Sequence, residues 1–463
     1  MSFPRHAKYK DSGVEWLGQI PSHWAVKRLR FVAEINPSKS EVSHLAADTE
    51  VSFLPMEAIG EDGSLELDRV RPLADVQTGY TFFRDGDVTI AKITPCFENG
   101  KGAAMRDLCN GIGFGTTELI VARPKATQTT STYLHWLFTA RPFRKAGEAF
   151  MYGAGGQKRV PDDFVRDFAI GFPPLPEQRH IVSFLDREAA KIDALVEEQR
   201  RLIELLKEKR QAVISRAVTK GLNPNVPMRD SRVEWLGKVP VHWMVGKSGF
   251  YVSVLPGYAF SSAEFSFDES DTKLLRGINV GVAELRWDDV VYWVRKASDG
   301  LDAFELSEGD VVIGMDRPLI AGGMRVALVS CSDLPCLLLQ RVAKIHPGPS
   351  VDGRFIMRLL SSRAFEAHFA PETTGVSVPH ISGEQICNFV VPVPPLDEQR
   401  RICDFLEVEL TKLDTLHRES EFAVTLLGER RSALISAAVT GKIDVRGLVP
   451  QSETVQSPAD VLA

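Results

Sequence analysis

The chain has 463 residues, of which 44% are hydrophobic and 25% are charged, and its formal net charge is -6. This length is too great for one hydrophobic core and predicts two large domains with connectors, while the composition excludes extended disorder. A transmembrane helix is excluded because no run of eighteen apolar residues occurs, and the acidic balance means that any DNA-binding surface must be local.

The six cysteines form no CxxC pair and have no histidine nearby at zinc spacing, and the N-terminal residues MSFPRHAKYK lack the apolar region of a signal peptide. We therefore expect reduced, buried thiols in a cytoplasmic protein, and no metal site. The cysteines are Cys96, Cys109, Cys331, Cys336, Cys387 and Cys403.

Two segments of the sequence occur twice in the chain. The sequence DSGVEWLGQIPSHW at 11–24 returns as DSRVEWLGKVPVHW at 230–243, with 10 of 14 positions identical. The sequence PPLPEQR at 173–179 returns as PPLDEQR at 394–400 and opens a second likeness that continues to Thr219 and Thr440. The regions between the copies show no comparable likeness. The duplicated segments predict a structural frame that occurs twice. The regions between them predict a different domain within each copy of the frame.

Each of the two regions between the duplicated segments has the character of a mixed α/β domain. Runs of apolar residues bounded by Gly, Asp and Pro predict strands, and they are followed by a longer segment of helical character. In the first region we expect strands at 51–56, 88–94 and 115–124 and a helix at 131–150. In the second we expect strands at 310–316, 324–330 and 341–347 and a helix at 353–369. The same order without the same sequence indicates one fold that occurs twice.

Each PPLxEQR segment leads into a long helix. The first is predicted from Pro176 to Gly221 and the second from about Asp397 to Gly441, with a glycine ending each. Apolar residues recur at alternating spacings of four and three, which is typical of a coiled-coil seam. The seam residues are Ile181, Leu185, Ile192, Leu195, Leu202, Leu206 and Val213 in the first helix and Ile402, Leu406, Leu413, Leu416, Ala423, Leu427 and Leu434 in the second.

The seam is interrupted at matching places by an acid near the start of each helix, a neutral polar residue in the middle and a base near the end. This order favours antiparallel pairing, because each glutamate would then lie within about a turn of the basic residue of the other helix. The alternative is that these side chains sit on solvated helix flanks, since surface pairs contribute only about 0–1 kcal/mol. The residues are Glu188, Gln199 and Lys209, expected beside Arg430, Ser420 and Glu409 respectively.

The sequence offers no support for catalysis. It contains no G-x-x-x-x-G-K-[ST] phosphate loop and no Asn or Asp followed by Pro-Pro and an aromatic residue, the loop with which amino-group DNA methyltransferases hold a flipped base. The glycines of GIGFGTTEL lack the strand-to-helix setting of a dinucleotide fingerprint and indicate a turn. No serine lies in a nucleophile elbow.

The duplicated motifs resemble the specificity subunit of type I restriction-modification systems. The resemblance rests on the paired W-L-G-x-[IV]-P-x-H-W openings, the paired P-P-L-x-E-Q-R helices, and IAKITPCFENGK at 90–101 followed by GFGTTELIVARP. It covers nearly the whole chain. It implies an α/β (α+β) protein with a pseudo-twofold internal repeat, in which two target recognition domains are joined by two long helices that form an antiparallel coiled coil. The corresponding segments are recognition domains at 1–172 and 222–392 and connector helices at 173–221 and 393–442. The Pro, Ser and Gln of the last residues predict a flexible tail at 443–463.

The same resemblance implies a function without catalysis. Each recognition domain would read one half of a bipartite double-stranded DNA target, and the helical pair would set the spacer and dock two methyltransferase subunits. Adenine methylation would belong to those subunits, and ATP-driven translocation and cleavage to restriction subunits. S-adenosylmethionine, ATP and magnesium would therefore bind the partners, and this chain would hold no cofactor.

The candidate DNA-binding residues are polar or cationic side chains in turn-forming segments, since Arg, Lys, Asn, Gln and Ser read base edges and phosphates. For each of them the alternative is a solvated charge or a turn residue. In the first domain they are Lys92, Thr94, Asn99, Lys101, Gln157, Lys158 and Arg159. In the second, which has IGMDRPL where the first has IAKITPC, they are Arg317, Arg325, Thr374, Ser377 and His380.

The residues repeated in both copies are interpreted as parts of the frame, because residues that read sequence should differ between the domains. Trp16, Trp24, Trp235 and Trp243 are therefore expected to pack the frame and not to stack on bases. The repeated triplets are interpreted as helix-start or subunit-docking residues, because a carboxylate in the first turn favours the helix dipole. They are Glu177, Gln178 and Arg179, and Glu398, Gln399 and Arg400.

Two other classes of function stay open at this point. One is a coiled-coil adaptor that binds other proteins without reading DNA, which the acidic net charge favours. The other is an enzyme with an unrecognised site, which no motif favours.

Overall fold

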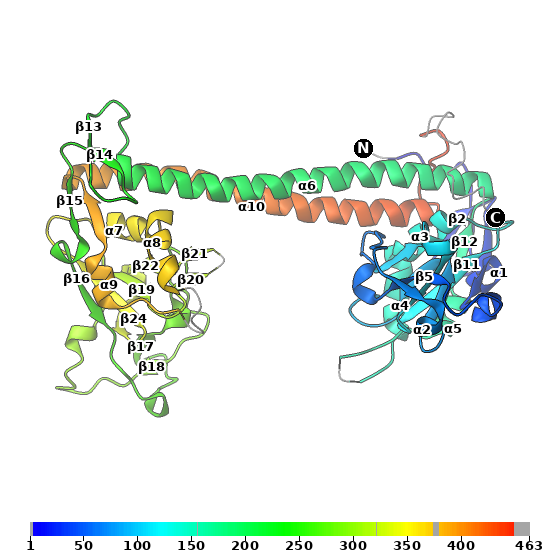
Figure 1. Cartoon of the computed structure of the whole chain (residues 1–463), viewed down its shortest axis with the longest axis horizontal. Coiled ribbons are helices and arrows are strands. Elements are labelled where there is room, and N and C mark those ends of the chain that lie inside the picture. Colours follow the sequence, from blue (N-terminus) through cyan, green and yellow to red (C-terminus); the bar gives the residue numbers. More distant parts are fainter. Residues whose placement is uncertain (1–2, 155, 321, 374–378, 449–463) are drawn as a thin grey trace. The chain divides into compact units, whose positions relative to one another are not determined.

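The computed structural model describes residues 3–154, 156–320, 322–373 and 379–448. The chain divides into two compact units: unit 1 comprises Met1–Gln199 and Phe422–Ala463, and unit 2 comprises Arg200–Glu421. The two long helices, α6 (Leu175–Lys220) and α10 (Leu396–Val439), each continue from one unit into the other (Figure 1). The helices lie within the expected segments 173–221 and 393–442, but the boundary between the units falls inside both helices and not at their ends.

Unit 1 is a mixed α/β structure. Its strands are β1 (Tyr9–Asp11), β2 (Gln19–Pro21), β3 (Ala25–Arg28), β4 (Ala33–Ile35), β5 (Glu50–Leu54), β6 (Val70–Pro72), β7 (Thr81–Arg84), β8 (Val88–Ala91), β9 (Gly102–Ala104), β10 (Ile112–Gly115), β11 (Leu119–Pro124) and β12 (Ala169–Phe172). Its shorter helices are α1 (Leu29–Val32), α2 (Leu73–Val76), α3 (Ser131–Thr139), α4 (Arg141–Phe150) and α5 (Asp162–Asp167). The strands form sheets of order β6-β5-β10-β7, β4-β11-β8-β9, β1-β2 and β12-β3.

Unit 2 repeats this architecture. Its strands are β13 (Met228–Asp230), β14 (Lys238–Pro240), β15 (Met244–Lys247), β16 (Val252–Pro256), β17 (Thr272–Leu275), β18 (Tyr292–Trp293), β19 (Val311–Gly314), β20 (Leu319–Ile320), β21 (Gly323–Met324), β22 (Val326–Leu328), β23 (Cys336–Leu338), β24 (Val342–Pro347) and β25 (Val390–Val393). Its shorter helices are α7 (Gly353–Leu360), α8 (Arg363–Thr373) and α9 (Gly383–Asn388). The sheets have the orders β16-β24-β19-β22, β18-β17-β23, β13-β14, β15-β25 and β20-β21.

The sheets of the two units correspond. The antiparallel sheet β4-β11-β8-β9 has its counterpart in β16-β24-β19-β22, and the parallel pair of β5 with β10 recurs as β17 with β23. The prediction of one mixed α/β fold used twice is therefore confirmed. Each predicted single helix is in fact two: Ala140 adopts an extended conformation between α3 and α4, where Pro142 starts a new first turn, and α7 and α8 are separate across Ser361 and Ser362.

The repeated tryptophans pack against the frame, as predicted, although Trp16 is 39% exposed. Trp24 and Trp243 are buried in the main hydrophobic cores of units 1 and 2 respectively. Trp16 stacks on Phe168 with ring centroids 4.9 Å apart, and Trp235 stacks on Phe389 at 5.0 Å. Apolar burial of such large rings is among the strongest stabilising contributions to a core.

The halves of α6 and α10 pack against each other within each unit. In unit 1, Ile181, Leu185 and Ile192 share a core with Leu434 and Ile435 of α10. In unit 2 the corresponding core combines Leu206 and Ile214 with Leu410 and Leu413. The early part of one helix therefore meets the late part of the other, and the predicted antiparallel direction is confirmed.

The register of this pairing differs from the one predicted. An ion pair of 2.9 Å joins Asp193 to Arg431 in unit 1, so Glu188, five residues earlier, lies opposite the position of Ser436. Arg430 then lies opposite Ala194, six residues from Glu188 or about 9 Å along the helix. Glu188 is instead bonded to Lys191 and Arg187 of its own helix.

Unit 2 shows the same shift. Arg210 pairs with Asp414 over 3.2 Å, which sets Lys209 opposite Thr415. Glu409 binds Lys412 of its own helix at 2.6 Å. The predicted partners were wrong because acids outside the seam, Asp193 and Asp414, form the pairs across the helices. Gln199 and Ser420 lie at the two sides of the unit boundary, and their pairing stays a prediction.

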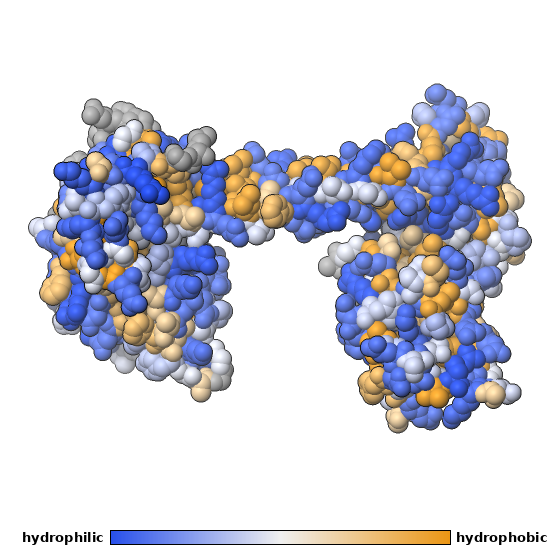
Figure 2. Space-filling model, turned by 180° about the vertical axis from the view of Figure 1, so that it is seen from behind, coloured by the Kyte–Doolittle hydropathy of each residue, from blue (hydrophilic) through white to orange (hydrophobic). Residues whose placement is uncertain are grey.

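Several predicted seam residues are exposed. Leu195, Leu202 and Leu416 are 45%, 39% and 46% exposed, although the seam pattern predicted them to be buried. Figure 2 shows apolar side chains among polar ones on the surface of the long helices. The strict spacing of four and three overestimates the contact between the helices, because several seam residues pack in the core of the globular region of their own unit.

The ends of the long helices follow the sequence. Gly221 and Gly441 have φ of +75° and +72°, a left-handed conformation that glycine adopts readily and that ends a helix. The predicted flexible tail is wrong for its first residues: Val445 is buried in the core of unit 1, and the amide of Asp444 donates to the carbonyl of Pro4 over 2.8 Å. Residues 449–463 lie outside the described part of the chain.

The thiols differ from the expectation in one respect. All six cysteines are free, as expected, but Cys331 is exposed and Cys96, Cys109 and Cys387 are half-buried. Only Cys336 and Cys403 are buried, and burial raises the pKa of each thiol to about 12.

Candidate nucleic-acid interface

In unit 1, the chain that leaves β8 runs beside a second segment, and predicted DNA-binding residues lie on both. The amide of Thr94 donates to the carbonyl of Lys158 over 2.9 Å, and the amide of Val160 donates to the carbonyl of Lys92 over 2.8 Å. The Thr94 hydroxyl also accepts from the amide of Lys158. These bonds bring Lys92, Thr94, Lys158 and Arg159 together, with Gln157 exposed in the adjoining turn.

Acidic neighbours set the charge of this surface. Arg159 donates to both oxygens of Glu118 at distances between 2.7 and 3.1 Å, and this hydrogen bonding lowers the pKa of the Glu118 carboxyl. The Lys92 Nζ lies 4.0 Å from Asp162. Lys92 and Arg159 line a depression of about 400 Å³ together with the exposed Tyr152. Glu118, which the sequence did not single out, belongs to the same TTEL segment that carried the family resemblance.

Two other predicted residues of unit 1 are engaged away from this surface. The Lys101 ammonium is half-buried and donates to the carbonyl of Met56 over 2.8 Å. The Asn99 amide donates to Glu61 over 2.7 Å. The structure thus gives Lys101 an internal role, in which it holds the loop after β5, and leaves Asn99 at the exposed edge of the neighbouring turn.

Unit 2 builds the same pair of segments with other side chains. The amide of Arg317 donates to the carbonyl of Pro379 over 2.8 Å, and the amide of Ile381 donates to the carbonyl of Met315 over 2.9 Å. By position in this ladder Met315 corresponds to Lys92 and Arg317 to Thr94. Lys92 of unit 1 therefore has no cation at its equivalent position in unit 2, where the nearest cation, Arg317, lies two residues later.

Charges in the second unit converge on one carboxylate. Asp316 accepts from Arg341 over 2.8 Å, and its other oxygen lies 2.7 Å from Nδ1 of His380. Arg341 holds the place of Glu118, because the amide of Met315 donates to the carbonyl of Arg341 just as the amide of Lys92 donates to that of Glu118. Glu118 is thus replaced by a cation, Arg341, whereas the place of Arg159 is held by His380 and the acid Asp316 lies at the position of Ile93.

Beside this cluster lies a depression of about 650 Å³ in which guanidinium groups gather around Asp316. The arginines that line it are Arg276, Arg286, Arg317, Arg325 and Arg341. Arg325 is half-buried and donates to the carbonyls of Val280 and Asp316, and burial lowers its pKa. The sequence prediction found Arg317 and Arg325 but missed the other three, which come from separate strands and loops. Thr374 and Ser377 lie outside the described residues.

The repeated triplets build the junction between each globular region and its long helix. Gln178 and Gln399 are fully buried, and each side-chain amide donates to the carbonyl of a nearby proline, Pro173 or Pro394. Glu177 is buried as well and accepts from the indole of Trp24 over 3.1 Å. The docking interpretation is therefore wrong for these three residues, whose side chains are enclosed.

The helix-start alternative fits them instead. Glu398 accepts from the indole of Trp243 over 3.1 Å and lies 2.8 Å from His242, which repeats the contacts of Glu177 with Trp24 and His23. Arg179 and Arg400 are exposed, so their docking role stays a prediction.

Two searches of the described residues bear on other kinds of site. Among histidines, cysteines and carboxylates, His6, His23 and Glu177 are the group with the spacing to hold a metal ion. None of the helices in the described ranges is long and apolar enough to cross a membrane.

Known proteins resemble this chain over most of its length. The family model described as "Type I restriction modification DNA specificity domain" matches residues 21–205 and 270–421. The chain is 34% identical to the specificity subunit of the type I restriction enzyme EcoAI from Escherichia coli, over 86% of this chain and 78% of that protein. It is 41% identical over 166 residues to the EcoEI specificity subunit from the same organism, which covers 35% of this chain and 27% of that protein.

Solved structures share the fold. A chain from a study of complex assembly and conformational transition of the type I restriction-modification system aligns with a TM-score of 0.69 and 18% identity, covering 91% of this chain and 98% of the other. The HsdS subunit from Thermoanaerobacter tengcongensis aligns with a TM-score of 0.57, 18% identity and the same coverage. The motifs, the repeated fold and the family match agree: the chain belongs to the specificity subunits of type I restriction-modification systems.

Proposed function

We propose that this specificity subunit, the non-catalytic member of its complex, reads a bipartite DNA target, one part with each unit. The observation that carries the proposal is the hydrogen-bonded pair of segments that follows β8 and recurs after β19. The backbone is the same in both units, whereas the side chains on it differ in charge and reach. A repeated scaffold with different polar side chains can present two different sequences of donors and acceptors to base edges.

The charge of each surface supports contact with DNA despite the acidic chain. Unit 2 offers an arginine-lined depression, and arginine contacts phosphates and reads guanine through two parallel hydrogen bonds. Unit 1 offers Lys92, the exposed Lys158 and Arg159. The acidic partners Glu118 and Asp316 fix the guanidinium groups that they bind, which limits the number of orientations available to each.

Footprinting of the full chain with its methyltransferase partner tests this function. We expect protection of two short DNA blocks separated by an unprotected spacer. Failure to protect DNA at any salt concentration would favour the coiled-coil adaptor without DNA readout. One protected block would contradict the bipartite reading but not DNA binding itself.

We propose further that the long helices dock two methyltransferase subunits and, through them, restriction subunits. Apolar side chains exposed on these helices support this. In unit 2 they are Leu202, Leu205, Phe405, Val408 and Leu416, and in unit 1 they are Leu195, Phe422 and Leu426. Exposed apolar groups of this size favour a protein partner. The cofactors of the reactions, S-adenosylmethionine, ATP and magnesium, would bind those partners and not this chain.

The same helices would set the spacer between the two parts of the target. Insertion of one helical turn at opposed points of α6 and α10 should change the preferred spacer length and leave both recognised sequences intact. The preferred target can be measured by selection from random duplexes. A change in the recognised sequences themselves would place recognition in the helices and overturn the assignment of reading to the two units.

A further inference from the structure

The start of α6 carries a histidine contact that the second copy of the frame lacks. In both units a glutamate at the helix start accepts from a tryptophan indole and meets a histidine, as Glu177 does with Trp24 and His23. In unit 1 a second histidine, His6 of the N-terminal segment, also approaches the carboxylate. The aligned position of the second repeat is Asn225. The frame is therefore complete without His6, and His6 adds something specific to unit 1.

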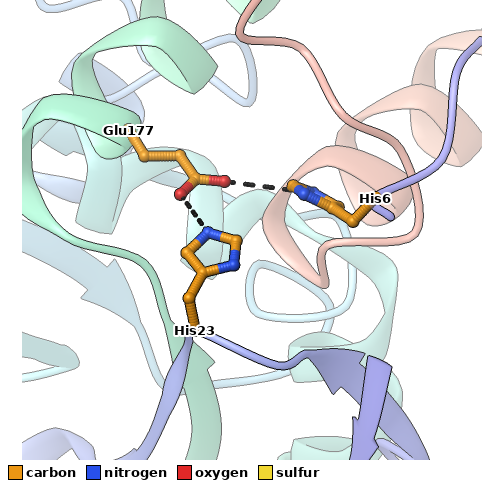
Figure 3. A group of neighbouring side chains, drawn as sticks. All are labelled: His6, His23 and Glu177. Atoms are coloured by element: carbon orange, nitrogen blue, oxygen red, sulfur yellow. Dashed lines mark hydrogen bonds and ion pairs between the residues drawn. The ribbon is translucent and has the colours of Figure 1, made fainter. Parts of the chain in front are cut away.

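The three side chains converge on a common point (Figure 3). The Nε2 of His23 lies 2.6 Å from one oxygen of Glu177, and the Nε2 of His6 lies 3.9 Å from the other. The ligand atoms of all three lie within 4.8 Å of one another. His6 and Glu177 are buried, whereas the side chain of His23 is half-exposed and leaves a path from solvent.

These atoms have the chemistry and nearly the spacing of a zinc site. Two imidazoles and one carboxylate are a common set of three protein ligands for zinc, which binds each at about 2.0–2.2 Å. Ligand atoms around a tetrahedral ion then lie about 3.4 Å apart. The observed separations of 2.6 and 3.9 Å involve different oxygens of Glu177, so the carboxylate and the two rings must turn until one oxygen lies about 3.4 Å from both Nε2 atoms.

The groups around the three side chains are those that orient metal ligands. The Nδ1 of His6 faces the carboxylate of Asp444 at 3.6 Å, and Trp24 holds one oxygen of Glu177. A carboxylate behind a ligating histidine fixes the ring and raises its basicity. The Arg446 guanidinium pairs with Asp444 over 2.6 Å and also lies 3.5 Å from His6 Nδ1, so metal binding through Nε2 requires the His6 proton to sit on Nδ1, facing Asp444 and not Arg446.

We propose that His6, His23 and Glu177 bind one divalent transition-metal ion, with zinc the best fit, through His6 Nε2, His23 Nε2 and a Glu177 oxygen. The ion clips the N-terminal segment to the opening of the frame and to the start of α6, while Asp444 brings in the segment that follows α10. The three protein ligands leave the fourth position of the ion to water, and unit 2, with His242 and Glu398 alone, lacks the third ligand.

The test uses the full chain after removal of metals with a chelator. Zinc is added during calorimetric unfolding, and cobalt(II) serves as a spectroscopic probe. We expect one equivalent of zinc to raise the melting temperature of the chain, and one equivalent of cobalt to give the visible bands of a tetrahedral ion without thiolate charge transfer, which separates the site from the six free cysteines.

Matched variants identify the site. His6→Ala should abolish the stoichiometric binding, whereas His242→Ala, which alters the corresponding histidine of unit 2, should keep it. Asp444→Asn should weaken zinc binding by about 10–100-fold. His23→Ala provides a second test if His6→Ala lowers the melting temperature of the metal-free chain. The proposal is overturned if the wild-type chain binds no stoichiometric cobalt, or if both His6→Ala and His23→Ala bind it as the wild type does.

Discussion

The two units place a buried aspartate at the same point, directly before β8 and before β19, and give it different partners. Asp87 in unit 1 accepts from the amide of Arg84 and from two nitrogens of Arg123, at 2.7 and 2.8 Å. Asp310 in unit 2 accepts from the amide of Ser307 and lies 2.7 Å from Nδ1 of His346, whose side chain is 61% exposed. The comparison teaches that the turn before β8 and β19 requires the carboxylate, whereas the cation on the neighbouring strand is free to differ.

The two candidate DNA-binding surfaces also give equivalent backbone positions different side-chain partners. Glu118 with Arg159 in unit 1 becomes Arg341 with Asp316 and His380 in unit 2. The backbone ladder is unchanged between them. A backbone ladder that carries an acid, Glu118, in unit 1 and a cation, Arg341, at the same position in unit 2 can vary its side chains without loss of the fold.

The largest expected effect is the loss of the buried carboxylate in unit 1. Asp87→Asn should destabilise the chain by about 3–5 kcal/mol, because it leaves the buried Arg123 without its principal counter-charge. Asp310→Asn should cost about 1–2 kcal/mol, because the exposed His346 can turn to water. Chemical denaturation of both variants measures the difference. Equal losses of stability in the two variants would show that the aspartate stabilises the chain through its hydrogen bond to the turn amide and not through the ion pair.

The second difference lies in the helices that cover these sheets. At the fifth position of α3 unit 1 has His135, where unit 2 has Met357 in α7. Burial, and then the charge of Arg431, lower the pKa of His135 from 6.5 to about 4. The unfolded chain therefore binds a proton at a higher pH than the folded chain, so stability falls as the pH drops from about 6.5 to about 4.

The total loss over that window should reach at most about 3 kcal/mol, and it should appear in unit 1. Hydrogen exchange followed peptide by peptide separates the two units. His135→Met should reduce the fall in protection of unit 1 over the same pH range. If acid weakens unit 2 first, another titrating group governs the response and the assignment to His135 is wrong.

A smaller and local effect is expected on DNA binding. Lys92→Ala in unit 1 and Arg317→Ala in unit 2 should each weaken binding by about 1–3 kcal/mol, since each removes a cation from one reading surface. Binding of the complex to duplexes with one randomised half-site should show each loss only when the matching half-site is intact. Lys101→Ala is the control, because its ammonium binds the carbonyl of Met56. A loss equal to that of Lys92→Ala would return Lys101 to the DNA surface.

The sequence predicted what repetition encodes directly. The frame, the two long helices and their antiparallel direction follow from residues that occur twice, such as Trp24 with Trp243 and Gly221 with Gly441. The candidate site was predicted in part, because Lys92 and Thr94 lie in a motif that carries the resemblance and Arg159 lies in the glycine-rich stretch GAGGQKR. Side chains brought in by topology could not be found this way: Arg276, Arg286 and Arg341 are distant in sequence and meet only around one depression.

The sequence pattern also did not predict which of the repeated polar side chains are buried or in which register the two long helices pair. The repetition of Gln178 as Gln399 fits an interface and an internal junction equally well, and only their burial and their hydrogen bonds to proline carbonyls distinguish the two. The three ligands of the proposed metal site stand at positions 6, 23 and 177, so no local spacing reveals them. The predicted helix register was wrong because we assigned the ion pairs to polar residues within the seam. The pairs are formed by Asp193 with Arg431 and by Arg210 with Asp414, which lie beside the seam.

The smallest expected effect concerns those flank residues, and it compares the two halves of the helix pair. Asp193 with Arg431 and Arg210 with Asp414 form ion pairs with largely exposed carboxylates. A double-mutant cycle with alanine at each pair should give a coupling of about 0.2–1 kcal/mol in both units, as for exposed pairs generally. Arg431 also lies 5.7 Å from the ring centroid of Trp136, so its single substitution should cost more than that of Arg210 while the coupling stays equal. A clearly larger coupling in unit 1 would mean that the ring strengthens the ion pair itself, and the two halves would then differ in how firmly their register is held.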